Sequence, residues 1–139
     1  MPISYQTDGV KMPAIAKKNI TAWIKAVAES YGKKVGEIAY IFCSDEKILE
    51  VNRTYLQHDY YTDIITFDYT EGNKIAGDLF ISLDTVTTNA QQFNSTYNEE
   101  LHRVIIHGIL HLCGIDDKGP GEREKMEAAE NKALQLLNT

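Results

Sequence analysis

The chain of 139 residues is 43% hydrophobic and 24% charged, a balance that predicts one folded domain over residues 1–139 and argues against wholesale disorder. It contains no apolar run of the roughly 20 residues that span a membrane. It also lacks a basic start followed by an apolar stretch, so we expect neither a membrane segment nor a signal peptide. The two distant cysteines, Cys43 and Cys113, are then expected to be reduced thiols in a cytoplasmic protein.

The first part of the chain alternates strand and helix patterns. Residues 3–6 fit a short strand, and apolar residues recur near helical spacing over 14–31, with Gly32 following as a stop. Residues 35–43 alternate in the manner of a strand. Ser44 then reads as the start of a further helix.

The second part of the chain opens with two strand patterns, at 62–69 and 78–83, which predict a hairpin or a neighbouring pair. Helical patterns follow at about 84–93, 98–113 and 121–137. Helices and strands mixed within one domain predict an α/β or α+β fold with a small sheet.

The segment HGILHLCGIDD, residues 107–117, places two histidines in an apolar run. At about 100° per residue, His107 and His111 lie about 40° apart on one helix face. Gly114 allows the left-handed turn that ends a helix, and the returning chain can bring Asp117 to the same point. Such a set with an open fourth position is typical of catalytic zinc. We therefore expect one Zn²⁺, or another divalent metal, on His107, His111 and Asp117.

The spacing H-G-x-x-H-x-x-G-x-x-D overlaps the metal-binding consensus of metzincin proteases, with two differences. Gly108 stands where those proteases need a glutamate as general base, which argues against peptide hydrolysis by their route. Asp117 stands in place of a third histidine, and a carboxylate oxygen also binds zinc. The alternative interpretation is a hydrogen-bonded histidine pair that holds no metal.

The other candidate residues fit less well. His102 lies about 140° around the helix from the first histidine of the motif and Cys113 about 120°, so we expect neither to be a ligand. His58 falls in an expected loop. Asp63 either lines a cleft at the metal site or only begins a strand. Asp116 either orients a ligating imidazole or caps a turn.

Several segments resemble the YbeY family, the bacterial rRNA-maturation endoribonucleases. HGILHLCGIDD resembles the family signature H-G-x-L-H-L-x-G-Y-D-H, and residues 52–69, NRTYLQHDYYTDIITFDY, resemble its N-x-x-Y-R-x-x-D-x-P-T-D-V-L-S-F segment. Residues 76–84, AGDLFISLD, are similar to its G-D-I-x-I-S element, and residues 122–130, EREKMEAAE, to its M-x-x-x-E tail. The matches keep their order over about residues 48–130.

The resemblance implies a fold, a reaction and partners. The fold would be a compact α+β domain with a small mixed four-stranded sheet, about five helices and one metal, usually zinc, at the end of the motif helix. The reaction would be cleavage of single-stranded RNA in late 16S rRNA 3′-end maturation and ribosome quality control, with His107 and His111 as catalytic residues. The small ribosomal subunit, a ribosomal protein and a GTPase would be partners.

The sequence departs from the family pattern at two positions. Asp117 aligns with the third histidine ligand, and Leu56 aligns with an arginine thought to contact RNA. A guanidinium offers five donors to phosphate and leucine offers none. Arg53, one helical turn upstream, either takes over this catalytic role or is a solvated helix residue.

The net charge of −6 argues mildly against a nucleic-acid ligand, because phosphate-binding surfaces are usually basic. Six lysines lie near the N-terminus: Lys11, Lys17, Lys18, Lys25, Lys33 and Lys34. They form either a solvated helix face or a positively charged surface for RNA. Two rival functions remain. The missing glutamate at position 108 disfavours a hydrolase of peptides, although other substrates stay open, whereas Leu56 favours a non-catalytic ribosome-assembly factor with a structural metal.

Overall fold

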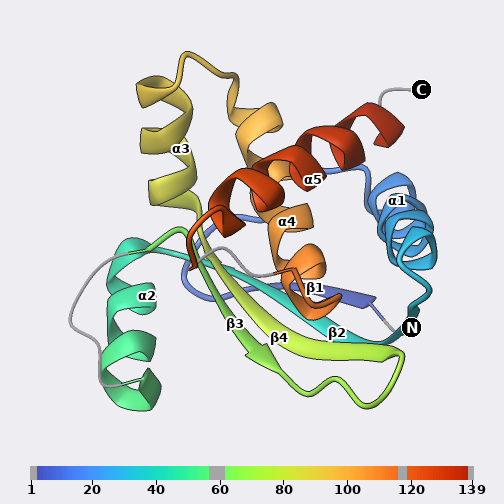
Figure 1. Cartoon of the computed structure of the whole chain (residues 1–139). Coiled ribbons are helices and arrows are strands. Elements are labelled where there is room, and N and C mark those ends of the chain that lie inside the picture. The colour runs from blue at the N-terminus through green and yellow to red at the C-terminus, as the bar shows by residue number, and fades with distance from the viewer. Residues whose placement is uncertain (1–2, 57–61, 116–118, 138–139) are drawn as a thin grey trace.

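The computed structural model describes residues 3–56, 62–115 and 119–137. Its strands are β1 (Ile3–Thr7), β2 (Lys34–Cys43), β3 (Ile64–Asp68) and β4 (Lys74–Ser82). Its helices are α1 (Lys17–Ser30), α2 (Asp45–Val51) with the π-helical turn η1 (Asn52–Leu56), α3 (Leu83–Gln92), α4 (Tyr97–Leu112) and α5 (Glu122–Leu137). The expected α+β fold, a small sheet packed with five α-helices, is confirmed (Figure 1). None of the described helices is both long and apolar enough to cross a membrane.

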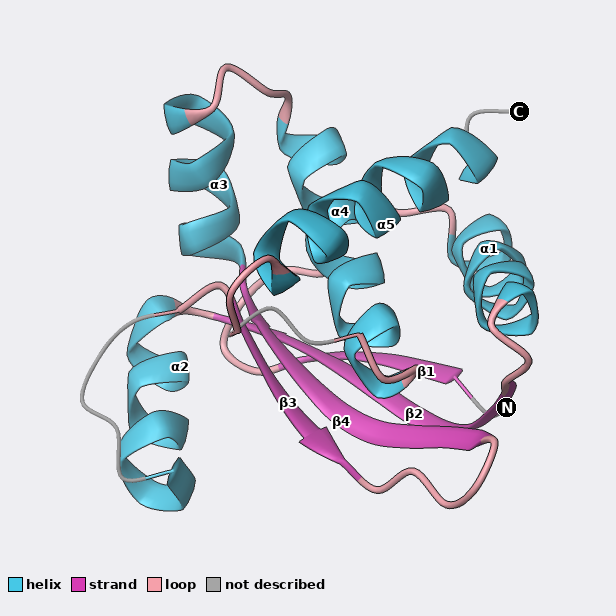
Figure 2. Ribbon diagram, viewed as in Figure 1, coloured by secondary structure: helices cyan, strands magenta, loops and turns pink. Residues whose placement is uncertain are grey.

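The sheet is mixed and has the order β1-β2-β4-β3 (Figure 2). β1, β2 and β4 are parallel, and β3 returns antiparallel to β4 as the predicted hairpin. β4 begins at Lys74 and not at the predicted residue 78, because its first residues pair with β2 from Lys34 onward. Ala76 and Gly77 favour strands weakly, so local propensity alone hid this part of the strand.

The two faces of the sheet bury different helices. Ile75, Leu79 and Ile81 of β4 are fully buried in the main core, which α1, α4 and α5 complete on one face. α2 packs on the other face, where a smaller cluster contains Cys43, Ile48, Val51 and Ile65. Side chains alternate between the faces of a strand, which explains why residues of one strand belong to two cores.

Two buried hydrogen bonds fix the helices of the main core. The Tyr40 hydroxyl on β2 donates to the Ile105 carbonyl of α4 over 2.8 Å. The Trp23 indole N–H on α1 donates to the Ala133 carbonyl of α5 over 2.7 Å. Nine of the sixteen residues of α4 are buried, so this helix is the centre of the fold. The histidine motif is therefore carried by the most enclosed helix.

Helix starts are set by hydroxyl caps: Ser44 caps α2 as predicted, whereas α3 and α4 each begin one residue before the predicted start. The Ser82 hydroxyl accepts from the Thr85 N–H and caps α3, while Asp84, the first residue of the predicted helix, accepts from the Asp45 N–H at 3.0 Å. The Thr96 hydroxyl accepts from the Glu99 N–H at 3.1 Å and begins α4. Both hydroxyls satisfy amide groups that would otherwise lack a partner at a helix start.

Removing the Tyr40 hydroxyl should weaken the join between sheet and α4. Tyr40→Phe should lower the free energy of unfolding by about 0.5–1.5 kcal/mol, the usual net value of one buried hydrogen bond. Tyr69→Phe is the control, because the Tyr69 hydroxyl is exposed and its bond to Asp78 is 3.4 Å long. Urea denaturation of both variants measures the difference, and equal midpoints would contradict the expectation.

Candidate metal centre

The C-terminal end of α4 has the glycine-terminated geometry that the motif predicts. Gly114 has φ +102°, in the left-handed region that residues other than glycine avoid. Its N–H donates to the His111 carbonyl at 3.0 Å, and the Ile115 N–H donates to the Leu110 carbonyl at 3.1 Å. These two bonds are the Schellman arrangement, which closes the last helical turn. The chain thus leaves α4 abruptly, about one turn beyond His111 and two turns beyond His107.

Gly108 lies on the side of α4 that faces the sheet. A Cβ at this position would overlap the Leu79 side chain and come within 3.0 Å of Ile64 Cδ1. Glycine is therefore required for α4 to lie close to β4 and β3. A glutamate here would enter the core and not the site, so the general base of the metzincin proteases has no place at position 108.

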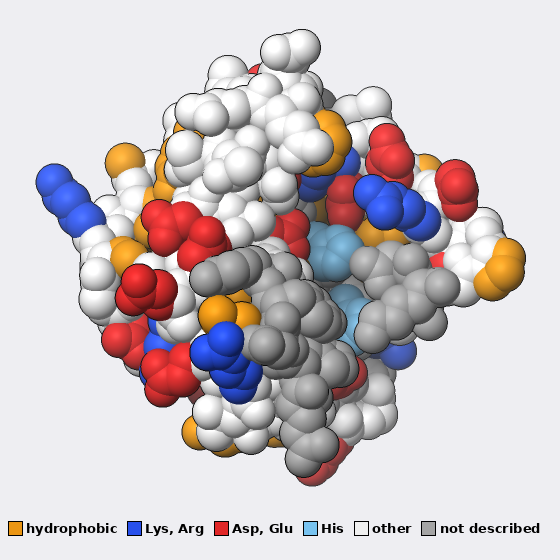
Figure 3. All heavy atoms as spheres, turned by 90° about the vertical axis from the view of Figure 1, so that its left-hand side faces the viewer, with side chains coloured by type: hydrophobic (Ala, Val, Ile, Leu, Met, Phe, Trp, Pro, Cys, Tyr) orange, Lys and Arg blue, Asp and Glu red, His pale blue; other side chains and the backbone are white. Residues whose placement is uncertain are grey.

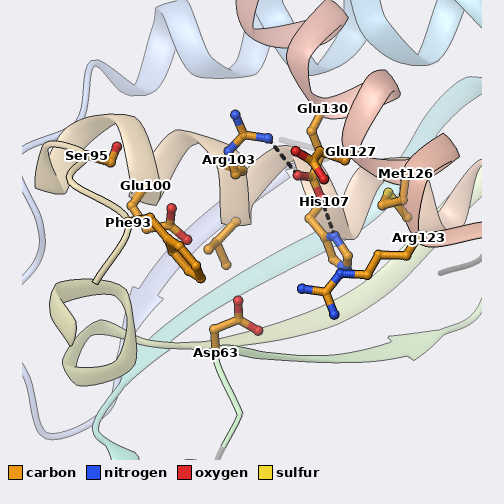
Figure 4. Close-up of a pocket in the computed structure, with 11 residues that line it drawn as sticks. Asp63, Phe93, Ser95, Glu100, Arg103, His107, Arg123, Met126, Glu127 and Glu130 are labelled. Carbon is orange, nitrogen blue, oxygen red and sulfur yellow. Dashed lines mark hydrogen bonds and ion pairs between the residues drawn. The ribbon is translucent and has the colours of Figure 1, made fainter. Parts of the chain in front are cut away.

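The His107 imidazole is held by an acidic residue of α5. Its Nδ1 lies 2.7 Å from Glu130 Oε2, and Glu130 is only 8% exposed (Figure 4). Because an ionised carboxylate only accepts hydrogen bonds, Nδ1 carries the proton and Nε2 has the lone pair that a metal takes. The other Glu130 oxygen accepts from Arg103 Nη1 at 2.8 Å, and Arg103 Nη2 donates to Asn131 Oδ1 at 2.7 Å.

This arrangement fits a metal ligand. Histidines that bind metals usually donate their second ring nitrogen to a carboxylate, which fixes the ring and makes it a better ligand. His111 follows His107 by one turn and is half-buried. Within the described ranges, no three His, Cys, Asp or Glu side chains form a complete metal-binding group. Asp117, the predicted third ligand, and the neighbouring Asp116 lie outside the described residues.

A pocket of about 490 Å³ opens beside His107; we call it the α3–α5 pocket because it extends from the turn after α3 along α4 to α5. Figure 3 shows histidine side chains reaching the surface in a hollow, with carboxylates nearby. The pocket wall includes Glu130, Arg103 and Arg123. It also includes Asp63, the residue that directly precedes β3. The predicted cleft role of Asp63 is thus supported by its position.

Burial alters the acidity of two carboxyl groups in this pocket. The pKa of Asp63 is raised by burial, and the nearby His107 partly offsets the rise. The pKa of Glu100 is raised by burial first and then by the charge of Asp63, while Arg103 lowers it. Both carboxyls thus hold a proton more readily than in water. The pocket therefore combines imidazole, guanidinium and carboxyl groups beside one another.

The other predicted candidates lie elsewhere. Arg53 is exposed on η1 and does not line the α3–α5 pocket. Burial lowers the pKa of His102, whose ring lies 6.1 Å from the Trp23 ring between α4 and α1. Burial raises the pKa of Cys113 to about 11, so its thiol is protonated near neutral pH in the absence of a metal. His58 lies outside the described residues.

A family profile described as Endoribonuclease YbeY matches residues 3–138. The chain belongs to the YbeY family. An Endoribonuclease YbeY of Phocaeicola vulgatus is 79% identical over 136 residues, covering 98% of this chain and 99% of that one. One from Porphyromonas gingivalis is 54% identical and covers 97% and 89%. The solution structure of TM1509 from Thermotoga maritima has a TM-score of 0.66 at 26% identity and covers 98% and 91%.

The structure adds residues to the YbeY motif that sequence reasoning did not assign to the site. Glu130 is the glutamate of the M-x-x-x-E tail, so its place in that pattern was the available signal. Arg103 lies one turn before His107 and had no signal beyond that spacing. Arg123 and Phe93 also line the pocket, and nothing in the sequence separates them from ordinary surface residues.

Enlarging Gly108 should disturb the packing that supports the motif. Gly108→Ala should lower the free energy of unfolding by about 1–3 kcal/mol, because the added methyl group overlaps Leu79 in a packed core. Gly119→Ala is the control, because its Cβ would meet only the side chain of Glu122. Urea denaturation should show a lower midpoint for Gly108→Ala alone. Unchanged stability of Gly108→Ala would mean that the helix and sheet are not closely packed here.

Proposed function

We propose that this chain is a metal-dependent endoribonuclease that cuts single-stranded RNA in late 16S rRNA 3′-end maturation and ribosome quality control. The observation that carries the proposal is the His107–Glu130 bond beside His111, in a chain whose family match extends over residues 3–138. Relatives of 75–79% identity are named Endoribonuclease YbeY, which supports the same reaction class here. We further propose that it acts in the cytoplasm on the small ribosomal subunit, with a ribosomal protein and a GTPase as partners.

Zinc is the proposed metal, held by His107, His111 and Asp117. Two imidazoles and one carboxylate suit zinc, although other divalent metals accept the same ligands. When bound, the metal would lower the pKa of a coordinated water toward about 7 and polarise a phosphoryl oxygen. No glutamate can serve from position 108, so the proton acceptor is another group.

The remaining residues keep the ligands in place. Glu130 holds the proton on His107 Nδ1 and sets the direction of Nε2. Arg103 binds the second Glu130 oxygen and neutralises its charge, so Glu130 is a charge-assisted acceptor fixed from two sides. Both histidines lie on an enclosed helix, which limits the movement of the ligands before RNA binds.

Gly108 also bears on the rival functions. A peptide hydrolase using a glutamate at this position is unsupported, because the position faces Leu79 and Ile64. A non-catalytic assembly factor would show the same metal site without cleavage. Purified protein free of contaminating nucleases should therefore be tested on single-stranded RNA, with His111→Ala as the inactive comparison. Equal cleavage by both proteins would refute catalysis at this site.

Loss of a ligand should remove the metal. Purified chain should contain close to one zinc, whereas His107→Ala and His111→Ala should lose most of it, and Asp117→Ala should bind more weakly. Asp117→His should still bind metal and favour zinc more strongly over harder cations. Elemental analysis and chelator competition measure these effects.

His102→Ala is the control for the metal measurements, since His102 is on the same helix but packs beside Trp23. Full metal content in His107→Ala and His111→Ala would contradict the ligand assignment. An unchanged affinity in Asp117→Ala would place the third ligand at another residue.

Arg53 is proposed to supply the phosphate contact that Leu56 lacks. Arg53→Ala should then slow cleavage of one single-stranded RNA, and Leu56→Arg should speed it, with a larger effect at low salt. Lys125→Ala serves as a control, because Lys125 is exposed and pairs only weakly with Glu122 at 3.4 Å. Equal rates for wild type, Arg53→Ala and Leu56→Arg would leave the lysines near the N-terminus or a partner as the source of positive charge.

A further inference from the structure

The α3–α5 pocket contains more than the metal site requires. His107 borders it, but the pocket extends along α4 to the turn between α3 and α4, where Phe93 and Ser95 line it (Figure 4). Its volume of about 490 Å³ is in the range of sites that hold a small ligand. Val104 and Met126 give it an apolar wall. The pocket is therefore large enough to hold one nucleotide beside the histidines.

Glu100 is the unexpected group in this pocket. It is only 7% exposed, yet its carboxyl forms no hydrogen bond or ion pair with any described residue. In the described part of the chain, no fully enclosed side-chain oxygen or nitrogen is without a partner, so the Glu100 oxygens keep their access through the pocket. Asp63 lies close enough for its charge to raise the pKa of Glu100. Acceptor oxygens facing an enclosed space predict a ligand that presents N–H donors.

Phe93 offers a flat apolar surface at the mouth of the same pocket. It ends α3 and is 63% exposed, although most large apolar side chains of the chain are buried. In Figure 4 its ring points into the space that Glu100 and Asp63 also face. Unstacked bases of single-stranded RNA bind to such aromatic rings and to polar groups at their Watson–Crick edge.

Arg123 supplies the positive charge. It is exposed on α5, lines the pocket beside His107 and forms no ion pair with any described residue, whereas Arg103 is paired with Glu130. The pocket has four carboxyl groups and two guanidinium groups, so a phosphate would be repelled from its interior. The charges thus favour one orientation, with the base inside and the phosphate at Arg123.

We propose that the α3–α5 pocket is a nucleotide subsite that takes one unpaired base of the RNA next to the bond that is cut. Phe93 stacks on the base, Glu100 and Asp63 accept hydrogen bonds from its edge, and Arg123 binds its phosphate. The exocyclic amino group of guanine, adenine and cytosine carries two N–H hydrogens and can donate to both carboxyls, whereas uracil offers only its single N3–H, so the pocket prefers the first three. That the ligand is part of an RNA strand rests on the proposed ribonuclease function. That the pocket suits a flat ring with N–H donors rests only on the residues that line it.

Binding of mononucleotides tests the subsite without any cleavage. The full chain, loaded with zinc, is titrated with GMP, AMP, CMP and UMP, and backbone amide shifts are followed by NMR. The amino-bearing nucleotides should shift Phe93, Ser95, Glu100 and Arg123 and bind at least several-fold more tightly than UMP. Equal affinity for GMP and UMP would overturn the edge recognition, and shifts confined to other residues would overturn the subsite.

Variants assign the three contacts. Phe93→Ala should weaken GMP binding roughly 5- to 150-fold, the range for loss of one base–aromatic stack. Glu100→Gln should reduce the preference for GMP over UMP. Arg123→Ala should weaken GMP but leave guanosine, which has no phosphate, unchanged. Tyr69→Ala is the matched exposed aromatic on the β3–β4 turn, and Lys132→Ala the matched exposed cation on α5 outside the pocket.

The results separate this proposal from the proposed function. If RNA is cut but no mononucleotide shifts the pocket residues, the subsite is wrong and the ribonuclease function stands. If amino-bearing nucleotides bind as expected but RNA is not cut, the subsite stands and the catalytic function fails. If Phe93→Ala binds GMP as tightly as wild type while Tyr69→Ala does the same, the ring does not stack on the base and the proposal is refuted.

Discussion

Close packing of α4 against the sheet is the constraint on which the site depends. Gly108 removes the side chain that would keep α4 away from Leu79 and Ile64, and the Tyr40 hydroxyl binds the carbonyl of Ile105 nearby. Because the Gly108 side of α4 packs on the sheet, the helical repeat places His107 and His111 on another side of the helix. The same packing makes α4 rigid, so side chains on its open side are held in fixed positions.

The second determinant is the contact between α4 and α5. Glu130 is nearly buried and carries a charge that has to be compensated, since an unpaired carboxylate away from water is costly. His107 and Arg103 provide that compensation at 2.7 and 2.8 Å. The interaction thus serves the fold and the site together: it joins two helices and fixes the tautomer of the imidazole. This explains why a tail segment far from the histidines in sequence matches the family as well as the motif does.

The conflict between an acidic chain and an RNA substrate has a local answer in the pocket. The net charge of −6 is spread over the molecule. Near the site, Arg103 balances the charge of Glu130, and burial raises the pKa of Glu100, which favours its neutral form. Electrostatic attraction of phosphate falls off within about 10 Å in salt, so nearby guanidinium groups matter more than the total charge. Arg123 lies on α5 and Arg53 on η1, so under the two proposals they would contact different parts of the RNA strand.

The sequence by itself determined the family, the mixture of strands and helices, and the turn after His111, because periodicity, glycine and motif spacing are local properties. It placed His107 and His111 on one helix face for the same reason. It could not show that Glu130 binds His107, that Gly108 faces Leu79, or that Glu100 and Phe93 share a pocket. Those contacts join residues from 7 to 29 positions apart in separate elements, and only packing in three dimensions decides them. The starts of α3 and α4 each differed by one residue from the prediction, because the Ser82 and Thr96 hydroxyls cap these helices while Asp84 binds the Asp45 N–H instead.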